Sequence, residues 1–131
     1  MNLFRYQVPL FLWATVVYFL SAFPNLYMVL HLPLGIEKVV HAFLFLVLCW
    51  LAWRLFYNQE GFQMMRNSAL LGAFVFCVVF GVLDEYHHNF VSGRSADPFN
   101  VVANIGGALL FVAIAVLLRR DGDKSEKSSK S

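Results

Sequence analysis

Charged residues are the scarcest class in this sequence. Asp, Glu, Lys and Arg make up 14% of its 131 residues, and hydrophobic residues make up 60%. A soluble domain carries about 25% charged residues. Long stretches have no polar face, which argues against a water-soluble helical bundle because its helices must present polar residues to solvent. The basic residues of the C-terminal tail are few and interrupted by acids, so no nucleic-acid partner is indicated.

Cysteine is also scarce. The two cysteines, Cys49 and Cys77, fall inside apolar segments, where they act as small hydrophobic residues. A disulfide is not expected between them, and no cysteine spacing typical of a zinc site exists. The sequence therefore requires no cofactor, and it leaves the identity of any cofactor unknown.

Four apolar segments account for nearly the whole chain. About 20 apolar residues at 1.5 Å rise cross a hydrocarbon layer of about 30 Å. The sequence therefore predicts an all-α polytopic membrane protein with four transmembrane helices, at about residues 8–23, 38–57, 68–86 and 98–118. These helices form a single membrane domain, residues 1–120. Residues 121–131 are rich in Lys and Ser and are expected to be a disordered cytoplasmic tail.

The distribution of Lys and Arg predicts the orientation. Eight of these residues lie in the N-terminus, the middle loop and the tail, and the other two, Lys38 and Arg94, lie in the remaining loops. Cytoplasmic loops carry the excess of Lys and Arg, so both termini are expected in the cytoplasm.

The middles of the four segments carry no ionisable side chain, whereas the ends predicted to face outward are polar. Those four ends carry Ser21, Glu37, Lys38, His41, Asp84, Glu85, His87, His88, Arg94, Asp97, Asn100 and Asn104. Residues three or four apart share one helix face, as do Lys38 with His41, and Asn100 with Asn104 and Gly107. Ala103 and Gly107 are small residues four apart that permit close helix approach. We therefore predict that the polar groups converge at the outer membrane interface.

These polar groups have a structural and a functional interpretation. In the first, they only pair with one another and hold the helix ends together. The charge balance favours the functional interpretation, because the set contains four acids (Glu37, Asp84, Glu85 and Asp97) and only two bases, Lys38 and Arg94. Either a carboxyl group is protonated, or a histidine is charged, or a cation is bound. The candidate ligands for such a metal ion are His41, Glu85 and His88.

Several short motifs resemble the VanZ-like membrane proteins, and together they span the chain up to the tail. The matching stretches are Ser21-Ala-Phe-Pro24, Lys38-Val-Val-His41, Asp84-Glu-Tyr-His87, Gly93-Arg-Ser-Ala-Asp97 and Ala103-Asn-Ile-Gly-Gly107. The chain departs from the family pattern at His88, where Gln is usual, and at Asn100, where a second Asp is usual. The resemblance implies a four-span protein of the bacterial cytoplasmic membrane. It also implies a link to resistance against a lipid-bearing glycopeptide antibiotic.

Three functions remain open. The first is an enzyme acting on a lipid-linked or cell-envelope substrate, with catalytic candidates Glu85, His41, His88 and Asp84. Its ligand-binding candidates are Lys38, Arg94, Asp97, Asn100 and Asn104, with the two bases holding an anionic headgroup. The second is a non-catalytic accessory or scaffold protein that uses the same groups only for binding. The third, a proton or ion transporter, is disfavoured because the ionisable groups lie near the helix ends.

Overall fold

The computed structural model describes residues 4–22, 34–90 and 98–130, and within these ranges the chain is helical with no strand. The helices are α1 (Phe4–Ala22), α3 (Leu34–Asn58), the short α4 (Gln63–Asn67), α5 (Ala69–His88) and α6 (Pro98–Lys130). The predicted all-α class is therefore confirmed.

Three of these helices, α3, α5 and α6, are long and apolar enough to cross a membrane, and the apolar part of α1, Phe4–Leu20, is shorter. Large hydrophobic side chains cover the outer surface of the bundle, among them Phe11, Val39, Phe43 and Leu71. Soluble monomers rarely expose contiguous apolar surface on this scale. This exposed apolar surface and the long apolar helices fit a membrane protein and are compatible with association with a lipid bilayer.

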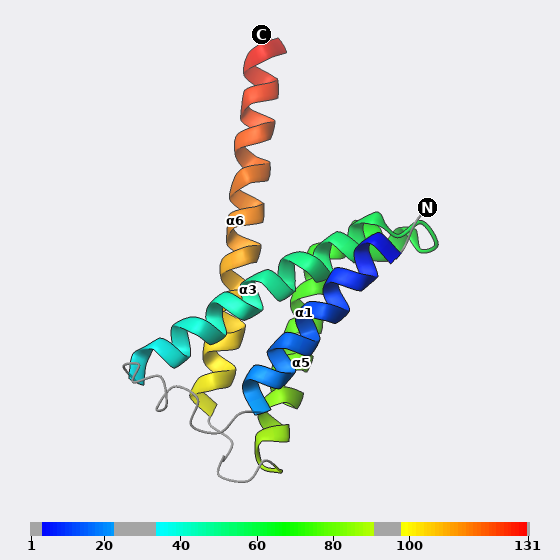
Figure 1. Ribbon diagram of the computed structural model, residues 1–131. Coiled ribbons are helices and arrows are strands. Elements are labelled where there is room, and N and C mark those ends of the chain that lie inside the picture. Colours follow the sequence, from blue (N-terminus) through cyan, green and yellow to red (C-terminus); the bar gives the residue numbers. More distant parts are fainter. Residues whose placement is uncertain (1–3, 23–33, 91–97, 131) are drawn as a thin grey trace.

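Helix α3 is the central element of the bundle. It packs most extensively on α6, and it also contacts α5 and α1. Its side chains Phe45, Leu48 and Cys49 are fully buried, and they meet Val17 of α1 and Ala108 of α6. Figure 1 shows α6 crossing α3, after which its C-terminal half extends away from the other helices.

The shorter helix α1 is docked on α3 by packing and by one hydrogen bond. The indole Nε1–H of Trp13 donates to the backbone carbonyl of Leu44 at 2.9 Å, and Val17 is buried beside it. An unpaired indole N–H inside a bilayer is costly, so this bond helps to fix α1 against the central helix.

Two segments differ from the expected boundaries. Helix α1 begins at Phe4, earlier than the expected start at about residue 8, so Pro9 lies inside the helix. Helix α6 continues to Lys130 through the segment 121–130, where the sequence predicts a disordered tail. These ten residues are exposed. Interactions within the segment itself stabilise this part of the helix, such as the ion pair between Lys130 and Glu126, one turn earlier, at 2.8 Å.

The order of the helices brings four helix ends together. Figure 1 shows the C-terminal ends of α1 and α5 and the N-terminal ends of α3 and α6 at the same end of the molecule. We call this the polar end, because the buried polar side chains His41, Asp84, Glu85, Asn100 and Asn104 all belong to it.

Candidate functional site

Two hydrogen bonds join α3 to α6 at the polar end. Lys38 Nζ donates to Asn100 Oδ1, and one turn deeper His41 Nδ1 lies 3.0 Å from Asn104 Oδ1. A carbonyl oxygen only accepts, so Nδ1 of His41 carries the proton. In a neutral imidazole the other nitrogen, Nε2, is then the basic one. The predicted faces Lys38/His41 and Asn100/Asn104 therefore meet directly.

The close approach of α3 and α6 depends on Gly107. A Cβ atom at this position would lie 2.0 Å from the backbone oxygen of Ala42, which follows His41 in the chain. At neighbouring Gly106 a Cβ would meet nothing within 4 Å. The contact of backbones at Gly107 therefore holds α6 close enough for Asn104 to reach His41.

The carboxylates of α5 lie beside this pair of helices. Asp84 is 4% exposed and Glu85 is 3% exposed, and the carboxylates of Asp84, Glu37 and Glu85 are near enough to His41 to interact with it electrostatically. At Gly81, one turn earlier on α5, a Cβ would lie 3.5 Å from Nδ2 of Asn104. Three acids thus lie within electrostatic range of a buried histidine.

The buried amide nitrogen of Asn104 has no hydrogen-bond partner among the described residues. Leaving a donor unsatisfied costs about 1–3 kcal/mol. Asn104 is 1% exposed, so this donor faces the interior between α6 and α5. It is a group that a bound molecule or an ordered water can satisfy.

A shallow groove of about 380 Å³ lies between the end of α5 and the start of α6. Its lining includes the buried carboxylate of Glu85 together with Val82, Tyr86, Pro98 and Val101. Val82 and Tyr86 belong to the exposed surface of α5. We call this feature the α5–α6 groove, and it connects the exposed apolar surface of the bundle with one of the buried acids.

A contact between α1 and α5 was missed by the sequence interpretation. The hydroxyl of Tyr18 and Nε2 of His87 are hydrogen-bonded at 3.0 Å, and the two rings are 4.7 Å apart. His87 was placed by the sequence among the polar residues of this end and in a family motif, and Tyr18 was not considered. Its position one turn before the end of α1 is the only signal that could have indicated it.

The remaining candidates fall wholly or partly outside the described residues. Arg94 and Asp97 lie in the segment 91–97, and of His88 only the backbone, at the end of α5, is described. Within the described part of the chain, no group of three His, Cys, Asp or Glu side chains is arranged to hold a metal ion. At the polar end, the charge balance of the described residues is three acids (Glu37, Asp84 and Glu85) against Lys38.

Comparison with known proteins supports the resemblance seen in the sequence. A sequence model of the VanZ/LLP1 family matches residues 2–119. The chain belongs to this family. The match covers α1, α3 and α5 and extends along α6 as far as Arg119, so the polar end is part of the family domain. No curated protein and no solved structure gives a significant match to the chain.

Proposed function

We propose that this VanZ-family protein crosses the bacterial cytoplasmic membrane four times, with both termini in the cytoplasm and the polar end at the outer interface. The eight Lys and Arg residues of the termini and middle loop support this orientation. The docking of α1 on α3 supports counting it as the fourth span.

At the outer interface the polar end binds the headgroup of a lipid-linked or cell-envelope molecule. One observation carries this proposal: Glu85 is buried, yet it lines a groove together with the lipid-exposed side chains Val82 and Tyr86. A lipid-linked molecule can keep its chain in the bilayer and pass its headgroup sideways between α5 and α6. A water-soluble ligand needs no such lateral opening.

The described side chains divide the chemistry between them. Lys38, held by Asn100, supplies a cation for a phosphate or carboxylate. Glu85 and Asp84 accept protons. His41 also accepts a proton, at Nε2, while its Nδ1–H donates a hydrogen bond to Asn104. A protein that only binds would need Lys38 and the asparagines, whereas an enzyme would also need the acids and the histidine.

Binding is tested with two probes that have the same polyprenyl chain: a polyprenyl phosphate and the corresponding polyprenyl alcohol. Native mass spectrometry of the detergent-purified protein measures both affinities. We expect tighter binding of the phosphate, and about a tenfold loss of that preference in Lys38→Met, because a hydrogen bond to a charged group contributes about 1.5–3 kcal/mol.

Two control variants accompany this measurement. Lys38→Arg keeps the charge and should keep the preference, and Lys124→Met removes a charge from the exposed tail and should change nothing. Equal affinity for phosphate and alcohol in the wild type would refute the proposal, and so would an unchanged preference in Lys38→Met.

The same variants separate chemistry from binding. The family's link to resistance suggests expressing the protein in a Gram-positive host and measuring susceptibility to a lipid-bearing glycopeptide. If the protein is an enzyme, Glu85→Gln keeps the preference for the phosphate and loses the effect on susceptibility. If it is a binding or accessory protein, Glu85→Gln keeps both and only Lys38→Met loses both.

A further inference from the structure

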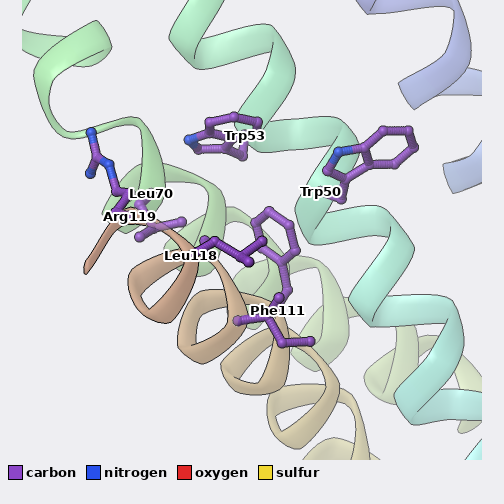
Figure 2. Close-up of a pocket in the computed structure, with 8 residues that line it drawn as sticks. Trp50, Trp53, Leu70, Phe111, Leu118 and Arg119 are labelled. Atoms are coloured by element: carbon purple, nitrogen blue, oxygen red, sulfur yellow. The ribbon is translucent and has the colours of Figure 1, made fainter. Parts of the chain in front are cut away.

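A second groove lies at the end of the bundle opposite to the polar end. It has a volume of about 350 Å³ and is formed by three helices. Figure 2 shows Trp50 and Trp53 of α3 on one side and Phe111 and Leu118 of α6 on the other, with Leu70 of α5. Arg119 follows Leu118 at the end of this row.

The divergence of α6 explains the groove. Helix α6 packs on the core as far as Ala115, and the following residues 116–120 are exposed where α6 extends away from the other helices. The indoles of Trp50 and Trp53 remain on α3, so an apolar space opens between the two helices. A volume of this size is at the lower end of the range for small-molecule sites, about 300–1,000 Å³.

Two of the arginines at this end, Arg54 and Arg66, are already engaged with aromatic rings. The guanidinium of Arg54 lies 5.1 Å from the ring centroid of Trp50 and 5.4 Å from that of Tyr6. Arg66 lies 5.5 Å from the ring of Tyr57. Among the described residues no ring contact or ion pair involves Arg119, which stands at the mouth of the apolar groove.

We propose that this groove binds a glycerophospholipid with a net negative headgroup. One acyl chain lies against Trp50, Phe111 and Leu118, and Arg119 binds the phosphate. The guanidinium fork matches the geometry of phosphate oxygens, and tryptophan is enriched at headgroup level. With the termini in the cytoplasm this end faces the inner leaflet, where a basic side chain attracts anionic lipid.

The proposal is tested with phosphatidylglycerol and phosphatidylcholine of identical acyl chains. Native mass spectrometry of the purified full-length protein measures the retention of each lipid. We expect phosphatidylglycerol to bind about fivefold more tightly, and Arg119→Gln to abolish that preference. Arg120→Gln is the matched control, because Arg120 carries the same charge but does not line the groove.

A second variant tests the groove without changing charge. Ala115→Phe places a large side chain in the lining, and it should lower the affinity for both lipids while the helical circular dichroism stays unchanged. Equal binding of both lipids to the wild type would overturn the proposal, as would equal losses in Arg119→Gln and Arg120→Gln. Neither result would affect the polyprenyl phosphate test, which depends on Lys38 at the other end.

Discussion

His41 and Asn104 form the deepest polar contact between α3 and α6. Both side chains are almost fully buried, and the hydrogen bond of His41 Nδ1–H to Asn104 Oδ1 fixes which imidazole nitrogen carries the proton. The contact lies next to the backbone contact between Gly107 and Ala42. The position of a candidate base is therefore set by a glycine on another helix.

The His41–Asn104 bond predicts a measurable coupling energy. In a double-mutant cycle with His41→Phe and Asn104→Leu, we expect an interaction of about 0.6–1.7 kcal/mol, the range for polar contacts between membrane helices. Equilibrium unfolding in mixed detergent micelles measures it. A coupling of zero would mean that the two side chains do not touch.

Two adjacent glycines provide a matched test of helix approach. Gly107→Ala should destabilise the protein by about 1–3 kcal/mol, because its methyl group overlaps the backbone of Ala42 and forces α3 and α6 apart. Gly106→Ala has open space and should be neutral or slightly stabilising. The melting temperatures of the two variants in detergent measure the difference. Equal melting temperatures would contradict the backbone contact between Gly107 and Ala42.

The sequence predicted much of the residue-scale arrangement. Helical spacing placed Lys38 with His41 on one face and Asn100 with Asn104 and Gly107 on another. Spacing along single helices could not show which residue on one face would meet which residue on the other. It gave no indication of the contact between Tyr18 and His87, because that contact depends on how α1 lies against α5.

At the scale of elements, α3 organises the bundle and α6 is its longest partner. The apolar runs predicted the main helices well, since length and hydropathy define a span. They did not predict that helix α6 would continue through the exposed segment 121–130. A hydropathy signal ends with the apolar residues, whereas backbone hydrogen bonding along a helix does not need them.

The packing of α5 on α3 predicts a specific cross-link. Cys49 and Cys77 are buried on these helices, and their thiols are within hydrogen-bonding reach of each other. A membrane-permeant oxidant such as iodine should join them, so that neither thiol reacts with an alkylating reagent after unfolding. Mass spectrometry reads the loss of both alkylation sites, with Cys49→Ala as the control. Full alkylation of both thiols after oxidation would contradict the predicted packing.

At the scale of the whole molecule, the bundle has two chemically different ends. The buried acids and amides lie at one end, and the arginines held by aromatic rings lie at the other. Length, hydropathy and charge distribution predicted this polarity. The grooves could not be predicted, because they depend on where α6 leaves its neighbours and on which side chains remain behind.

The orientation of the two ends is tested by reporter fusions. Alkaline phosphatase, which is active only outside the cytoplasm, should be active when fused after Phe90 and inactive when fused after Gln59 or Lys130. Green fluorescent protein at the same positions should give the reverse pattern. Phosphatase activity at Lys130 would place the polar end inside and would exclude an outer-leaflet ligand.

The most direct test of the central claim is to map where a lipid headgroup meets the protein. A polyprenyl phosphate with a diazirine beside its phosphate is photolysed with the protein in liposomes, and the labelled peptides are sequenced. Binding through the α5–α6 groove predicts that the label is concentrated in residues 82–89 and 98–101 and is reduced in Lys38→Met. Label spread evenly over the lipid-facing surface, including Phe11 and Leu12 of α1, would contradict the account.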